Sequence, residues 1–97
     1  MTQVLTEVFA VVAADREDEL LRGFDRLLEE PTPDGLLRTE LLRGTDGWRI
    51  QTLWRDRAAL DAMRASGEPP AAPRLFASVG AEPSLRILEV AHRHEVG

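Results

Sequence analysis

The sequence contains no cysteine, has no long apolar run and carries no excess of positive charge. Without cysteine there is no disulfide bond, and no thiolate is present to act as a nucleophile or metal ligand. No apolar stretch approaches the ~20 residues that a transmembrane helix needs. The net charge of −5 argues against nonspecific binding to nucleic-acid phosphates, which requires clustered cations. The sequence therefore predicts a protein that associates with neither membranes nor nucleic acids.

The rest of the composition is typical of a soluble globular protein. The chain has 97 residues, 43% of them apolar, which is enough for one small core and predicts a single domain spanning residues 1–97. The first residues, MTQVLTEVF, lack the basic start and the small-residue cleavage site of a secretory signal peptide. We therefore expect a cytoplasmic protein.

Apolar periodicity predicts alternating strands and helices. Residues 3–13 are rich in β-branched side chains, whereas residues 15–30 carry leucines and Phe24 at helical spacing after Asp15, a candidate N-cap. The sequence GTDG (44–47) provides a hairpin turn, and Asp56 is placed to start a second helix. The expected order is strand 3–13, helix 15–30, strand 36–43, strand 48–55, a helix from 56, a loop 66–73, a short helix 74–80 and strand 84–96.

This β-α-β-β-α-β order predicts an α+β protein of the ferredoxin-like class, in which helices cover one face of an antiparallel sheet. The first strand is apolar on both sides, since Val4, Val8 and Ala10 alternate with Leu5 and Phe9. Two helices cover only one face, so the other would expose a large apolar patch. We therefore expect a homodimer in which two sheets pack face to face as a dimeric α/β barrel.

The junction between the third strand and the second helix carries a recognisable motif. The segment WRDRAAL (54–60) resembles the W-x-[DS]-x-x-A-[LF] signature of the antibiotic biosynthesis monooxygenase family, whose members are small dimeric α/β-barrel proteins. DGLLRTELLRG (34–44) is similar to the second strand of that family, and the acidic helix after a valine-rich first strand also fits. The resemblance covers about residues 4–63.

The resemblance implies a cofactor-independent monooxygenase that oxidises a phenolic or polycyclic aromatic compound, for example an anthrone or quinol to a quinone. Members commonly use Asn and Trp, and sometimes Tyr, His or Arg, whereas this chain has no Asn and no Tyr. A non-catalytic protein that binds small molecules in a biosynthetic pathway is the alternative. The Asn–Trp–His set of the haem-degrading branch is also incomplete, with Trp54 as its one counterpart. We expect no cofactor and no metal.

Candidate catalytic residues are Trp54, Glu7 and His92. Trp54 either forms the flat wall of an aromatic site or only fills the core between strand and helix. Glu7 is either an edge residue or a buried carboxylate whose raised pKa would suit a base. His92 and His94 fall on one side of the expected last strand, which suggests either a solvent-exposed pair or a proton acceptor, since two imidazoles alone do not form a metal site.

Candidate substrate-binding residues come from several of the expected elements. Thr52 shares a strand face with Trp54, and its hydroxyl can orient a ligand without acting as a general base. Arg38 forms either a surface pair with Glu40 or a polar group of the pocket. The loop GEPPAAP (67–73) either closes over the pocket mouth or is a plain connector. The predicted substrate-binding set is Trp48, Thr52, Arg38, Phe24 and Phe76.

Overall fold

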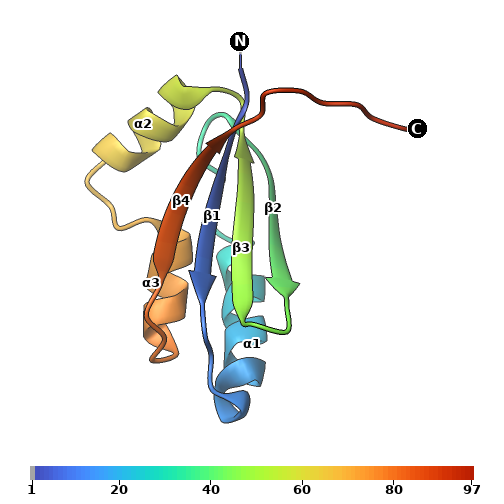
Figure 1. The fold of residues 1–97 in the computed structure, drawn as a ribbon. Helices are drawn as coiled ribbons and strands as arrows, with labels where there is room; N and C mark the ends of the chain where they lie inside the picture. Colours follow the sequence, from blue (N-terminus) through green and yellow to red (C-terminus); the bar gives the residue numbers. More distant parts are fainter. Residues whose placement is uncertain (1) are drawn as a thin grey trace.

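The computed structural model describes residues 2–97 and has the element order expected from the sequence (Figure 1). A 3₁₀ turn precedes the first helix, and the connection between the last two helices is short. The elements are β1 (Val4–Ala10), η1 (Ala14–Arg16), α1 (Glu17–Leu27), β2 (Leu36–Arg43), β3 (Trp48–Trp54), α2 (Arg57–Ala65), α3 (Ala71–Ser78) and β4 (Ser84–Glu89).

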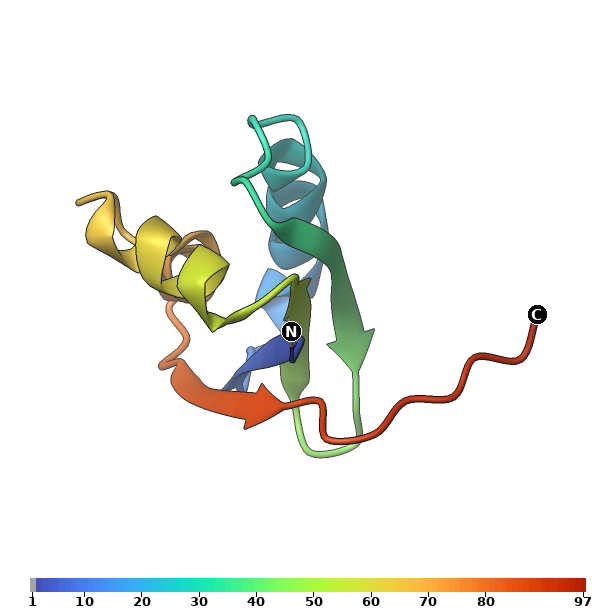
Figure 2. The same ribbon diagram turned by 90° about the horizontal axis from the view of Figure 1, so that it is seen from above.

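The four strands form one antiparallel sheet in the order β2-β3-β1-β4. All three α-helices lie on one side of it, as the view from above shows (Figure 2). We call that side the helix-covered face and the other side the open face. The ferredoxin-like class is confirmed, although the sheet of the single chain is open and does not close into a barrel. No helix within residues 2–97 is long and apolar enough to cross a membrane.

β1 contributes apolar side chains to both faces, as its sequence predicted. Val4 and Val8 join the buried core under the helices, whereas Leu5 and Phe9 lie on the open face and are partly exposed. The open face is also partly covered by long side chains, because the guanidinium carbon of Arg49 lies 4.8 Å from the centre of the Phe9 ring.

Two short sequence motifs form the local structures that they predicted, namely the cap of α2 and the hairpin turn between β2 and β3. The Asp56 carboxylate accepts a hydrogen bond of 2.8 Å from the Ala59 amide and so caps α2. In the hairpin turn, the Gly44 amide donates to the Gly47 carbonyl oxygen at 2.8 Å. Gly47 has a φ of 153°, and a Cβ there would lie 2.8 Å from the Phe9 ring, so glycine is required on both counts.

Several boundaries differ from the expectation. β1 ends at Ala10 rather than residue 13, and α1 spans Glu17–Leu27 rather than 15–30. Asp15 lies inside η1, and its side chain does not cap a helix. α3 begins at Ala71 rather than residue 74, because Pro73 falls in the first turn, where a helix needs no amide donor from it. β4 ends at Glu89, so His92 and His94 lie in an exposed extended segment beyond the sheet (Figure 2).

The larger core cluster lies between the sheet and the pair α1 and α3, and we call this region the filled half. Phe76 and Leu20 are fully buried in it, beside Ile50 of β3. α1 and α3 pack closely because Gly23 has no side chain, and a Cβ there would lie 2.5 Å from Cδ1 of Leu75. Of these two helices, α1 has the apolar stripe at helical spacing that its sequence predicted.

A smaller cluster lies under α2, at the other end of the sheet. There Ala59 and Leu60 pack on Val4 and Trp54, with Met63 partly buried beside them. α2 stands apart from α1 and α3 (Figure 1). The core cluster under α2 has fewer buried residues than the cluster under α1 and α3. We call this region the hollow half.

Candidate functional site

The hollow half contains a cavity of about 670 Å³ between the helix-covered face and the surrounding helices and loops. That volume falls within the range of roughly 300–1,000 Å³ typical of small-molecule sites. The sheet contributes its floor, and α2, the end of α1 and the two proline-containing loops contribute its walls. The floor residues are Thr6, Val8, Leu36, Thr39, Thr52, Trp54, Leu85 and Ile87.

Three threonines form a polar row across the floor, which we call the threonine rung. Thr39 of β2 lies opposite Thr52 of β3, and Thr52 lies opposite Thr6 of β1. The hydroxyl oxygens of Thr39 and Thr52 are 3.0 Å apart, and the Thr6 hydroxyl donates to the Thr52 carbonyl oxygen at 3.4 Å. Because neighbouring strands place these residues in one register, three separated positions in the sequence form one site.

Trp54 forms one side of the cavity next to this rung. Its side chain is buried, at 3% exposure, and its indole N–H donates to the Thr6 hydroxyl oxygen at 3.2 Å. The indole N–H is therefore already occupied, and the ring face is what Trp54 offers to a ligand. Trp54 also packs on Leu60 of α2, so the residue both lines the cavity and fills the core between strand and helix.

The walls above the floor are mainly apolar, with Leu27, Leu60 and Met63 among them. Charged groups gather only at the mouth, where they are exposed. There Arg74 pairs with Glu30 at 3.3 Å, which ties α3 to the segment after α1. The remaining exposed residues at the mouth are Leu28, Pro31, Thr32, Pro33, Arg64, Glu68, Pro69 and Pro70, and the lining residues Ala71, Ala72 and Pro73 are partly buried.

The predicted binding residues separate into two groups. Thr52 and Trp54 line the cavity together. Phe24 and Phe76 belong to the core of the filled half and do not line it. Trp48 is buried there too, and its indole N–H donates to Glu17 at 2.9 Å while the Arg43 guanidinium lies 4.6 Å from the ring centre.

Glu7 and Arg38 lie on the open face, away from the cavity. β1 is an inner strand, so the expectation that Glu7 is an edge residue is wrong. Hydrogen bonds from Arg86 and Gln51, with the positive charges of Arg86 and Arg49, lower the pKa of Glu7 despite its burial, so the expected raised pKa is also wrong. This carboxylate is therefore ionised at neutral pH and is held by its neighbours.

Arg38 pairs with Glu40 at 2.7 Å, and both side chains are about half exposed. This geometry is the surface pair that the sequence left open as one of two interpretations. The histidines lie elsewhere again, exposed in the segment after β4. Within residues 2–97, no group of three or more His, Cys, Asp or Glu side chains is arranged to hold a metal ion.

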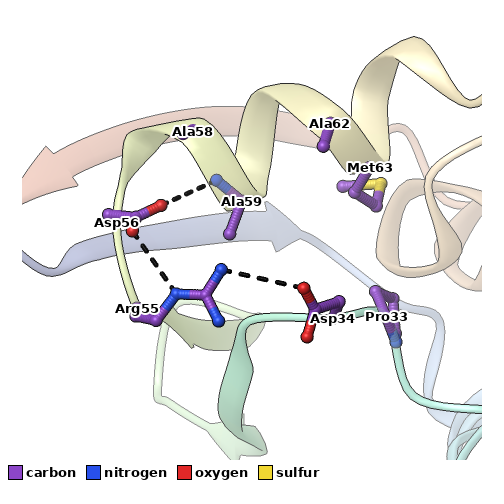
Figure 3. A pocket seen from close by; sticks show the side chains of 8 residues that line it. All are labelled: Pro33, Asp34, Arg55, Asp56, Ala58, Ala59, Ala62 and Met63. Atoms are coloured by element: carbon purple, nitrogen blue, oxygen red, sulfur yellow. Dashed lines mark hydrogen bonds and ion pairs between the residues drawn. The ribbon is translucent and has the colours of Figure 1, made fainter.

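A second, more open pocket of about 360 Å³ lies on the outer side of the α2 start (Figure 3). Arg55 bridges two carboxylates there, Asp34 at 3.7 Å and Asp56 at 3.4 Å. Pro33 and Met63 line both pockets and therefore separate them. The Arg55 contacts fasten the loop before β2 to the α2 N-terminus, which supports the wall of the larger cavity.

Sequence reasoning missed Thr6 and Thr39 as parts of the site. Each is a β-branched polar residue between apolar neighbours on the same strand face, as Thr52 is in its own strand. The common signal was that pattern, and the strand register needed to align the three was not in the sequence pattern itself.

Comparisons with known proteins place the chain in a family. The antibiotic biosynthesis monooxygenase family matches residues 4–72, so the chain belongs to that family. Among curated proteins, none matches this sequence.

Solved structures share the fold over nearly the whole chain. A haem-degrading protein from Mycobacterium tuberculosis is 26% identical, with 98% of each chain covered and a TM-score of 0.70. A conserved protein from Methanosarcina mazei is 16% identical, covering 98% of this chain and 95% of the other at a TM-score of 0.68. A putative antibiotic biosynthesis monooxygenase from Deinococcus radiodurans is 14% identical, covering 97% and 96% at 0.64.

Proposed function

We propose that the protein is a cofactor-independent oxygenase that oxidises an aromatic small molecule in the cavity of the hollow half. The observation that carries this proposal is the cavity of about 670 Å³, bounded by the ring of Trp54 and floored by three hydroxyl groups. An apolar enclosure with a few convergent polar groups is the usual design of a small-molecule site. Membership of the monooxygenase family supports oxygen chemistry at that site.

The proposed reaction starts from an acidic C–H bond, as in an anthrone. The methylene carbon loses a proton, and the resulting carbanion transfers electrons to dioxygen and forms a C–O bond. Protonation gives a hydroperoxide, which loses water and leaves the quinone carbonyl, so one oxygen atom enters the product and the other leaves as water. The side chains contribute through stacking on Trp54 and through hydroxyl donors to the anion that develops on the substrate oxygen.

The cavity residues are better suited to one of these tasks, stabilising the anion, than to the other, removing the proton. Its interior is lined by hydroxyls and apolar groups, and its ionisable side chains, such as Glu30 and Glu68, are exposed at the mouth. The substrate proton would therefore leave toward solvent through the mouth. Such a site suits substrates that are already acidic, since it stabilises the anion better than it removes the proton.

Haem is a poor fit to this cavity, although a haem-degrading protein of similar fold has been solved with two haems in its active site. The lining residues supply no imidazole, thiolate or phenolate for the iron, and the thioether of Met63 is their one sulfur ligand. Both histidines lie in the exposed segment after β4. We therefore assign no haem chemistry to this chain.

A second candidate is binding without turnover, as in a carrier protein of a biosynthetic pathway. The observation in its favour is that ionisable groups line only the mouth of the cavity. Oxygen uptake with anthrone and a hydroquinone, without added cofactor, separates the two functions. Uptake that falls when Thr52 is replaced by Val supports the oxygenase, and binding without any uptake supports the carrier.

We also propose that two copies pair through their open faces. The motive is the partly exposed Leu5, Phe9 and Leu88 on a face that has no helix over it. Burying apolar area stabilises association by roughly 25 cal/mol per Å². Light scattering at micromolar concentration should give twice the mass of one chain, and a stable monomer would exclude this assembly.

A further inference from the structure

The hydrogen bonds of the threonine rung leave one hydroxyl donor without a protein partner. A threonine hydroxyl has one hydrogen to donate and two lone pairs that accept. Thr6 uses its hydrogen on the Thr52 carbonyl oxygen and accepts from the Trp54 indole. Both sides of Thr6 are therefore engaged by the protein.

Thr39 and Thr52 share a single hydrogen bond, since their hydroxyl oxygens lie 3.0 Å apart and only one of them donates to the other. Two hydrogens are present and one is used. Within residues 2–97, neither hydroxyl has a second hydrogen-bond partner, so the other hydrogen has no protein acceptor. Thr52 is 8% exposed, and both residues line the cavity, so the free donor and its unused lone pairs face the ligand space.

The surroundings of this donor are apolar on either side. The next positions along the strands are Val8 and Ile50 in one direction and Trp54 in the other. A partly buried hydroxyl pair between apolar rows favours a ligand that brings an acceptor to that point, because the ligand itself shields the hydrogen bond from water. Hydrocarbon ligands would leave the donor unpaired, which costs free energy.

From this arrangement we infer that the hydroxyls of Thr39 and Thr52 together bind one carbonyl or phenolate oxygen of an otherwise apolar ring ligand. The inference deepens the proposed function and rests on ligand binding in this cavity. It does not require turnover. Thr6 is a positioning residue, since it fixes the Trp54 ring beside the rung and contributes no free donor of its own.

The chain provides its own reporter for a test. It has two tryptophans, so its amide–proton correlation spectrum contains two indole N–H signals, which Trp54→Phe assigns. The Trp54 indole is bonded to Thr6 beside the rung, and the Trp48 indole is bonded to Glu17 outside the cavity. Titration with 1-tetralone and with tetralin, which differ by one carbonyl oxygen, follows both signals.

We expect 1-tetralone to bind about 2- to 10-fold more tightly than tetralin, which corresponds to one net hydrogen bond. The Trp54 signal should move and the Trp48 signal should stay. The double variant Thr39→Val/Thr52→Val should abolish the preference with little change in volume, because either hydroxyl alone would keep a free donor. The double variant Thr39→Ser/Thr52→Ser, which keeps both hydroxyls, should retain the preference. Thr45→Val, at an exposed position of the hairpin turn outside the cavity, is the matched control and should leave the preference intact.

The results that would overturn the inference differ from those that would overturn the proposed function. Equal affinity for the two probes, or a preference that survives the double valine variant, overturns the inferred role of Thr39 and Thr52 and leaves the cavity as a binding site. If neither probe moves the Trp54 signal, the ligand-binding cavity itself fails, and with it the proposed function. A preserved preference without oxygen uptake keeps the inference and rejects only the oxygenase.

Discussion

The filled and hollow halves of the helix-covered face are built on the same strands yet differ in what stands above them. Over the filled half, α1 and α3 pack side by side, and Phe76 and Leu20 close the space completely. Over the hollow half, α2 reaches the sheet only through Ala59, Leu60 and Met63, and a cavity of about 670 Å³ remains. The difference shows that the cavity is set by where the helices lie rather than by the strands.

In each half, the side chains of the sheet suit what lies above them. The row of Leu41, Ile50 and Val8 lies in the filled half, at whose border Val8 also lines the cavity, and the neighbouring row of Thr39, Thr52 and Thr6 lies in the hollow half. Apolar residues are placed where a second layer seals them, and hydroxyls where space remains for a ligand. One half therefore supplies stability, and the other is free to supply binding.

The largest effect is expected in the filled half. Phe76→Ala should lower the free energy of unfolding by about 3–5 kcal/mol, because a fully buried ring leaves a space that the packed helices cannot refill. Urea denaturation measures the change. Leu28→Ala, at an exposed mouth position, is the control and should stay within about 0.5 kcal/mol. A loss below 1 kcal/mol for Phe76→Ala would mean that the filled half is not the main source of stability.

Trp54→Phe should have a moderate effect on stability and a clear effect on binding. We expect a loss of about 1–2 kcal/mol from the lost hydrogen bond to Thr6 and the smaller ring. Ligand affinity should also fall, since the stacking surface shrinks and Thr6 loses its donor. Thermal melts and titrations on the same variant measure both. Destabilisation with undiminished affinity would limit Trp54 to a role in the core.

On the open face, Glu7 makes the free energy of unfolding depend on pH. Its pKa lies below the ordinary value of 4.5, chiefly because Arg86 donates to the carboxylate. The unfolded state therefore binds the proton more readily, so the stabilisation is present above pH 4.5 and is lost as pH falls through the lowered pKa. Glu7→Gln should cost about 1 kcal/mol at pH 7, a modest figure because Arg86 is largely exposed.

The measurement compares wild type and Glu7→Gln by urea denaturation from pH 7 down to pH 3. The gap between them should be widest near neutral pH and narrow on acidification. A gap that widens on acidification would mean that the ion pair is not what lowers the pKa of Glu7. Glu40→Gln, which alters the half-exposed pair with Arg38 on the same face, is the matched control.

The smallest effect is expected on the solvent side of α2. Arg57 and Asp61 form an exposed pair at 3.0 Å with i,i+4 spacing, and Arg57→Ala should cost only about 0.3–0.5 kcal/mol. Affinity for 1-tetralone should not change, because α2 is held to the sheet by Ala59 and Leu60. A larger loss, or weaker binding, would show that surface charges help to hold α2 over the cavity.

The sequence predicted the fold well because its signals are local. Alternation located β2 at residues 36–43, the bounds found in the structure, and Asp56 marked the start of α2 through its capping carboxylate. Trp54 and Thr52 were correctly placed on one strand face. Each of these predictions depends only on residues near one another in the chain.

The remaining features of the fold and of the site depend on tertiary structure, which the sequence pattern does not specify. Thr6 and Thr39 join Thr52 only through strand register, and the position of Glu7 depends on which strand is central. Phe24 and Phe76 were expected at the ligand, but their helices lie over the filled half. The cavity arises where α1 ends and α3 begins, and helix periodicity does not specify those end points to within a turn.

The prolines at the mouth of the cavity affect the kinetics of ligand entry. Pro31 and Pro33 lie on one side and Pro69, Pro70 and Pro73 on the other, so much of the rim has a fixed φ before any ligand arrives. A rim that is already ordered loses little conformational entropy when a ligand enters. Association should therefore follow simple bimolecular kinetics, with an observed rate that rises linearly with ligand concentration and no slow closing phase.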